Sequence, residues 1–124
     1  MTPHDLAAWA ERAKPEEQRA VLEKVFALLK PEPPKGNSLA PTRQWRVWED
    51  DKILFTAMLA IGAYESAALM LVPEGWEVSM YFAMASFRPE VQLENEATRI
   101  KWEPPITGNA STPALALIAA IVRV

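Results

Sequence analysis

The sequence predicts an α/β (α+β) fold in which a three-stranded antiparallel β-meander packs with helices. Apolar residues recur at helical spacing over residues 2–30 and 53–72, whereas over residues 76–103 they alternate with a period of two. A second strongly apolar stretch, residues 114–122, follows a Thr112-Pro113 sequence typical of a helix start. The predicted order is therefore an N-terminal helical hairpin followed by an α-β-β-β-α core.

Length and composition favour a single domain, residues 1–124. Within it we predict N-terminal helices at 2–30, a proline-rich loop at 31–45 and the α-β-β-β-α core at 46–124. There is no cysteine, which excludes disulfides, thiolate catalysis and Cys-based zinc sites. The net charge of −3 gives no general attraction to nucleic acid or to anionic lipid.

The N-terminal helices have recognisable boundaries. Thr2 can cap the first helix, with Pro3 at its first position and Asp5 completing a capping-box-like start. Pro15 ends or kinks this helix and can open the next one. The start has no basic region followed by an apolar one, so we expect no signal peptide.

The central helix is predicted to begin after the acidic run Glu49-Asp50-Asp51 and to be broken near Gly62. Before it, residues 43–48 are expected to form a short strand or an extended arm. Ile53–Val72 is about as long as a bilayer span, but it carries Glu65, so a buried helix of a water-soluble domain is the better interpretation.

Three strands are predicted after the turn at Pro73-Glu74-Gly75. The first covers residues 76–84, and the second lies within 85–94, where Pro89 indicates an edge strand or a bulge. The third is expected at 97–103. The final helix is apolar on every side, so it must be covered nearly all round.

Two junctions in this pattern resemble a known family. They are Ala67–Trp76, which reads Ala-Ala-Leu-Met-Leu-Val-Pro-Glu-Gly-Trp, and Ala110–Ile121, which contains Thr-Pro-Ala-Leu-Ala-Leu. With the helix–meander–helix order, they resemble the phage ABA sandwich domain, named for its α-β-α layering. The resemblance implies a phage or prophage origin and no established activity.

No residues form a convincing catalytic, cofactor or metal site. His4 is the only histidine and is expected to be an exposed polar residue. Glu65, beside Tyr64, could act as a general base if it were buried, but exposure at the helix break is the simpler interpretation. The acidic runs at 49–51 and 94–96 match no calcium-binding loop and are interpreted as solvated. We expect the protein not to be an enzyme.

The candidate binding residues are Trp45, Arg46 and Trp48, where basic and aromatic side chains alternate. Three interpretations are open: a tryptophan tucked into the core from an edge strand, a protein interface, or stacking on nucleic acid. The neighbouring acids at 49–51 disfavour nucleic acid because they repel phosphate.

The sequence therefore predicts a non-catalytic phage- or prophage-derived accessory protein that acts through protein–protein contacts in the bacterial cytoplasm, without cofactor, metal or membrane. The alternatives are a nucleic-acid-associated regulator using Arg43–Trp48 and an uncharacterised enzyme. The partner would be a phage or host protein, or a second copy of the chain. Either the N-terminal helices or a homodimer would cover the second face of the sheet.

Overall fold

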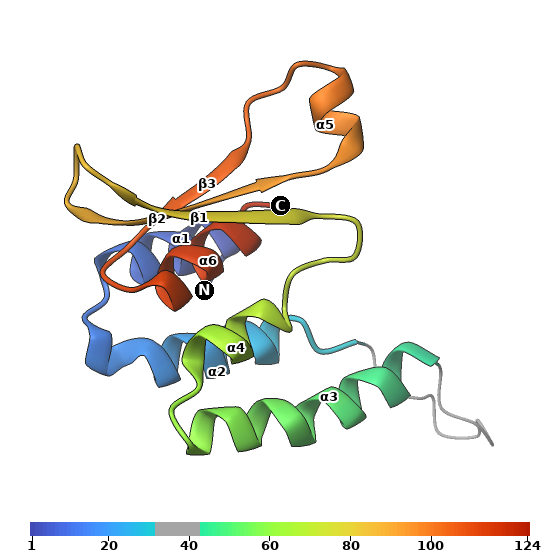
Figure 1. Cartoon of the computed structure of the whole chain (residues 1–124). Coiled ribbons are helices and arrows are strands. Elements are labelled where there is room, and N and C mark those ends of the chain that lie inside the picture. The colour runs from blue at the N-terminus through green and yellow to red at the C-terminus, as the bar shows by residue number, and fades with distance from the viewer. Residues whose placement is uncertain (32–42) are drawn as a thin grey trace.

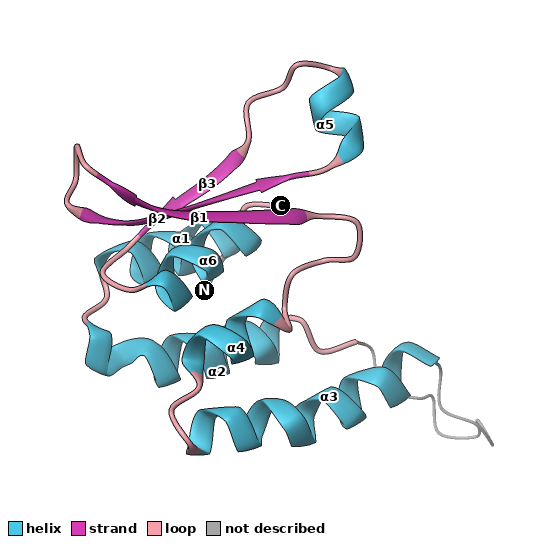
Figure 2. Ribbon diagram, viewed as in Figure 1, coloured by secondary structure: helices cyan, strands magenta, loops and turns pink. Residues whose placement is uncertain are grey.

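The computed structural model describes residues 1–31 and 43–124, with the side chains of 43 and 44 left aside. The described part is a mixed α+β fold with a three-stranded antiparallel sheet (Figures 1 and 2). In chain order its elements are α1 (Pro3–Arg12), the 3-10 turn η1 (Pro15–Glu17), α2 (Gln18–Leu28), α3 (Arg43–Ala60), α4 (Tyr64–Leu69), β1 (Glu77–Ala83), β2 (Arg88–Glu94), α5 (Glu96–Ile100), β3 (Ile106–Asn109) and α6 (Pro113–Ile121).

The predicted helix starts at both ends of the chain are confirmed. The Thr2 hydroxyl accepts a hydrogen bond from the Asp5 amide at 3.1 Å, and the Asp5 carboxylate accepts one from the Thr2 amide at 3.1 Å. This reciprocal pair is a capping box. At α6, the Thr112 hydroxyl accepts from the Leu115 amide at 3.2 Å, and Pro113 occupies the first helical position.

The helices stack in layers on one side of the sheet. Figure 1 shows α1 and α6 directly beneath the sheet, α2 and α4 below them, and α3 farthest away. Every residue from Ala114 to Ile121 is buried, because α6 packs against β2, β3, α1 and α4. The all-round cover that the apolar sequence of α6 demands is thus supplied within one chain.

The sheet has the order β1-β2-β3, with both pairs antiparallel. Val91 and Leu93 of β2 are completely buried against the helices, while Gln92 lies on the opposite face beside Tyr81. Pro89 predicted an edge strand or a bulge, and this was wrong, since β2 is central and its register is continuous. Pro89 lies beyond the last β2–β3 residue pair, Glu90–Asn109, where its missing N–H costs little.

The predicted third strand at 97–103 was wrong. Residues 96–100 form the short helix α5, which Asn95 caps by accepting a hydrogen bond from the Thr98 amide at 2.8 Å. The third strand comes later, as β3. Figure 1 shows that α5 stands away from the helical layers. An extended strand here would therefore not bury the apolar side chains that alternate along residues 97–103.

The predicted strand or arm at residues 43–48 was also wrong, because these residues form the first turns of α3. The acids at 49–51 therefore lie within this helix, where they are exposed, and do not precede it. The loop predicted at 31–45 overlaps the first three residues of α3, 43–45. Its stretch 32–42 lies outside the described residues. The break near Gly62 is confirmed, with a φ of +75° between α3 and α4.

We expected that either the N-terminal helices or a homodimer would cover the second face of the sheet. The first of these expectations was wrong, because the N-terminal helices do not cover that face. Figure 2 shows α1 beside α6, on the same side of the sheet, and no described helix packed flat on the opposite face. Along the part of the chain that the structure places, no helix is both long and apolar enough to cross a membrane.

A polar network joins the ends of the chain. The Glu11 carboxylate of α1 accepts from Nη1 of Arg123 at 3.0 Å, contacts Nη2 of the same residue, and accepts from the amide of Asn109 at 3.1 Å. Arg88 donates to the carbonyl oxygen of Glu11. The hydrogen bond from Arg123 is the main reason why the pKa of Glu11 lies below its usual value.

Glu11→Gln is expected to lower the free energy of unfolding by about 1 kcal/mol near neutral pH, because it removes charge-assisted hydrogen bonds. Since the pKa of Glu11 is lowered in the folded state, its contribution is present above the unfolded pKa and is lost as pH falls through the folded pKa. Urea unfolding of both proteins across the acidic range should therefore show the difference shrinking as pH falls. A difference independent of pH would contradict this account.

Candidate functional site

An aromatic cluster lies between α2 and α3. The ring of Phe26, on α2, stacks on Phe55 with centroids 4.4 Å apart and on Trp48 with centroids 5.4 Å apart. Trp45 lies one turn before Trp48 on α3, and the centroids of the two rings are 5.4 Å apart. We call these four residues the aromatic cluster. Phe26 and Phe55 are buried, whereas Trp45 and Trp48 are half-buried, so the cluster has both a packed floor and an accessible rim.

Two lysines lie over the tryptophan rings. The Nζ atom of Lys30, just after α2, is 5.4 Å from the Trp45 centroid and 5.5 Å from the Trp48 centroid. The Nζ atom of Lys52, one turn after Trp48 on α3, is 5.4 Å from the Trp48 centroid. These distances are within cation–π range. The accessible rim of the cluster is therefore positively charged.

Two cavities border the cluster, and Trp48 and Phe26 line both of them. One has a volume of about 690 Å³ and opens toward α4, where Met70, Leu71 and Glu74 complete its wall. The other is about 390 Å³ and lies along α2 and α3. Both volumes are in the range of ligand sites, which are mostly apolar with a few polar groups.

The indole Nε1 of Trp48 is buried and has no hydrogen-bond partner among the described residues. A buried N–H without an acceptor costs about 1–3 kcal/mol, so such groups are uncommon and often mark a functional position. Trp48 as a whole is half-buried and lines both cavities, so a molecule bound in either cavity would contact its ring.

The charges around the smaller cavity are mainly basic. Arg19, Lys30 and Lys52 line it, and the single acid there, Glu23, is paired with Arg19 at 3.0 Å. The larger cavity is different, since Asp51 and Glu74 line it. The smaller cavity is therefore suited to an apolar group carrying negative charge.

Of the three candidate binding residues, the structure brings Trp45 and Trp48 together but not Arg46. Arg46 is exposed, lines neither cavity and lies on another side of α3. Phe26, Phe55, Lys30 and Lys52 were not among the binding residues predicted from the sequence. The signal for the α3 members was the spacing 45, 48, 52, 55, which puts them on one helix face.

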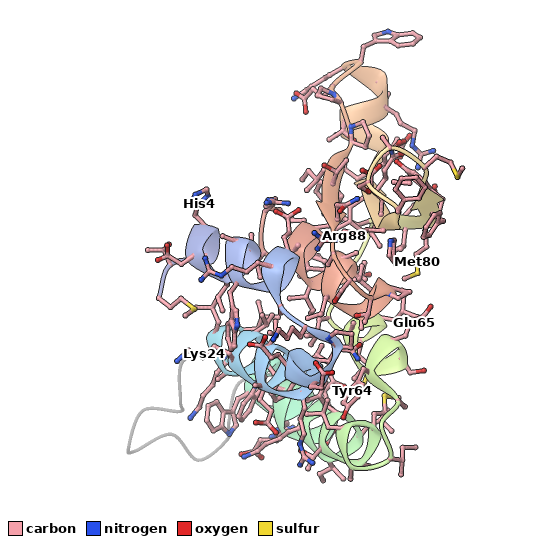
Figure 3. The ribbon with its side chains drawn as sticks, turned by 90° about the vertical axis from the view of Figure 1, so that its left-hand side faces the viewer. His4, Lys24, Tyr64, Glu65, Met80 and Arg88 are labelled. Carbon is pink, nitrogen blue, oxygen red and sulfur yellow. The ribbon has the colours of Figure 1, made fainter. Side chains whose placement is uncertain are left out.

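The other titratable candidates lie away from the cluster. Figure 3 shows His4 at the outer end of α1, pointing away from the protein, and Glu65 on the same side as Met80. Glu65 is exposed, which confirms the simpler interpretation of this residue. Tyr64 is half-buried against the core. Within residues 1–31 and 43–124, no three histidines or acids gather closely enough to hold a metal ion.

In comparisons with known proteins, no family model, no curated protein and no solved structure matches the chain. The geometry of the aromatic cluster therefore carries the interpretation of the site.

Proposed function

We propose that the protein is a non-catalytic accessory protein that binds a segment of another protein at the aromatic cluster. The observation that carries this proposal is the half-buried ring of Trp48, which lines two cavities and lies beneath the ammonium groups of Lys30 and Lys52. The resemblance of the two junctions to the phage ABA sandwich domain supports an origin in a phage or prophage. With it goes a site of action in the cytoplasm of the bacterial host.

The chemistry of the cluster defines the partner segment. The half-buried ring of Trp48, stacked on the buried ring of Phe26, offers an apolar surface for a large side chain, as tryptophans do at the centres of protein interfaces. Lys30 and Lys52 favour a neighbouring Asp or Glu. A backbone carbonyl of the segment would accept from Trp48. We therefore propose an acidic segment with a large apolar anchor.

Nucleic acid is the second candidate, because stacked tryptophans flanked by lysines also suit an unpaired base. Two observations favour protein over nucleic acid. The acids at 49–51 are exposed on the same helix as the tryptophans, and the chain carries a net charge of −3. Among the described side chains that line the smaller cavity, Lys30, Lys52 and Arg19 carry the positive charge that opposes these acids.

A random peptide library displayed against the intact protein tests the proposal. Peptides with Asp or Glu next to a large apolar residue should be enriched, and their affinity should fall at least about tenfold for Trp48→Ala. Trp102→Ala is the matched control. Trp102 follows α5 and is 94% exposed, so this variant should bind like the wild type.

Three results would count against the proposal: no enrichment, peptides that bind Trp48→Ala equally well, or peptides that depend on Trp102. An oligodeoxythymidine titrated into the wild type at low salt tests the second candidate. Nucleic acid would be favoured instead if the wild type binds the oligonucleotide, Trp48→Ala does not, and no peptide is enriched.

A further inference from the structure

The two edges of the sheet are treated differently. On β3, the carbonyl oxygen of Thr107 accepts from Nη1 of Arg123 at 2.9 Å, and the amide of Asn109 donates to Glu11 at 3.1 Å. These backbone groups point away from β2, so side chains close the β3 edge. A closed edge of this kind cannot pair with another strand.

The residue pairing of the sheet also shows which backbone groups of β1 point outward. In antiparallel sheets, successive residues turn their N–H and C=O groups to opposite sides. Since Thr107 and Asn109 point outward, their partners Gln92 and Glu90 point toward β1, where they face Ser79 and Tyr81. Val78, Met80 and Phe82 therefore turn their N–H and C=O groups to the free edge. Among the described residues, no side chain hydrogen-bonds to them.

This open edge lacks the usual protection. It contains no proline, no lysine and no bulge, and its one charged residue is Glu77 at the start. Its side chains are apolar and accessible: Met80 is 36% exposed and Phe82 is 55% exposed. The hairpin tip extends this surface with Met84 and Phe87, which are 73% and 74% exposed.

We propose that a second copy of the chain pairs with this edge, β1 against β1 in antiparallel orientation, to form one continuous six-stranded sheet. A two-fold axis would pass at Met80, which faces its own copy. In this register Val78 faces Phe82 of the second copy, and the outward backbone groups of both residues pair.

Charge selects this orientation. A parallel pairing would set two Glu77 side chains side by side, which is unfavourable. In the antiparallel pairing Glu77 faces Ala83 of the second copy. The two Glu77 side chains, each paired with Arg99 of its own chain at 2.7 Å, therefore lie at opposite ends of the interface.

The accessible apolar area of this edge reaches the lower limit for a specific dimer. Large side chains carry roughly 150–250 Å² each, so the exposed parts of Met80, Tyr81, Phe82, Met84 and Phe87 amount to on the order of 500 Å² per copy. Complete burial of these parts in both copies would amount to on the order of 1,000 Å², the lower bound for a specific interface. A cavity of about 320 Å³ beneath β1, lined by Met80, Phe82, Glu65 and Pro113, can take an apolar side chain of the second copy.

Sedimentation velocity of the full chain over a range of concentrations tests the proposal. The wild type should approach twice 13.9 kDa, and Met80→Lys should weaken the dimer at least about tenfold because it opposes two ammonium groups at the axis. Met80→Glu should do the same. An equimolar mixture of the two variants should recover the dimer, because the axis would then pair opposite charges.

Ile53→Lys is the control, since Ile53 is an apolar residue on α3 that is more exposed than Met80, at 76%, and its replacement should leave the dimer intact. Circular dichroism checks that each variant keeps its fold, which the exposure of Met80 favours. A monomeric wild type, a dimer that Met80→Lys leaves unchanged, a mass that keeps rising with concentration, or a mixture that stays monomeric would each overturn the proposal.

Discussion

Replacing Gly108 with alanine is expected to lower the free energy of unfolding by at least about 3 kcal/mol, the upper end of what overpacking costs. A Cβ atom at this position would overlap the carbonyl oxygen of Ala116 and lie 2.8 Å from the amide nitrogen of Ala120. Both atoms belong to the backbone of α6, so no side-chain rotation can make room. β3 and α6 would have to separate, which exposes the core between them.

Gly62→Ala is the matched control for Gly108→Ala. Nothing lies within 4 Å of the position of its Cβ atom, but its φ of +75° is unfavourable for alanine. We expect a loss of about 1 kcal/mol there, from the backbone conformation alone. Urea unfolding of both variants separates the two effects. Equal losses would show that the close approach of β3 to α6 is not what requires Gly108.

Leu117→Ala is expected to cost about 3–4 kcal/mol, because it leaves a cavity at the centre of the fold. Leu117 is completely buried in α6, the helix that packs against both the sheet and the second helical layer. Surrounding elements hold α6 on every side and cannot collapse into the space. Calorimetry or urea unfolding measures this loss directly.

Ile53→Ala removes a similar number of methylene groups from a residue that is 76% exposed, and it should change stability by no more than about 0.5 kcal/mol. A loss at Ile53 comparable with that at Leu117 would mean that α3 is packed far more completely than the structure shows. A loss below about 1 kcal/mol at Leu117 would contradict the central position of α6.

Helix boundaries were predictable because their signals are local. The Thr2 and Thr112 caps, the prolines after them and the break at Gly62 each act through atoms within four residues. The burial of α6 was predictable for a related reason, since a helix that is apolar all round has no side that can face water.

The third strand was not predictable from alternation. Ile100 and Trp102 alternate with charged residues as strand residues do, yet both are exposed, so no buried face rewards an extended conformation. Reciprocal hydrogen bonds between Asn95 and Thr98 cap a short helix at this point and stabilise it locally. The true strand, β3, has only four residues, and its defining feature is the approach of Gly108 to α6, a contact made in three dimensions.

The segment 43–48 shows how a short window misleads. Over six residues, alternating basic and aromatic side chains favour a strand. Over the eleven residues 45–55, the spacing of Trp45, Trp48, Lys52 and Phe55 is helical and places them on one face of α3. Phe26 completes the cluster from α2, across the 32–42 stretch, and no local pattern could pair it with Trp48.

The two proposed surfaces lie far apart in the fold. Figure 1 shows α3 in the helical layer farthest from the sheet, whereas β1 forms one edge of the sheet. A dimer joined along β1 would therefore carry two accessible aromatic clusters. Such a dimer would bind a partner that presents two acidic segments more tightly than it binds either segment alone.

The most direct test of the central claim is the indole N–H resonance of Trp48 during titration with an enriched acidic peptide. The chain has five tryptophans, and comparison with Trp48→Phe assigns the signal. We predict that the Trp48 signal shifts downfield as its unpartnered N–H gains an acceptor, while the signal of exposed Trp102 stays in place. A peptide that binds while the Trp48 signal remains unmoved would contradict the account.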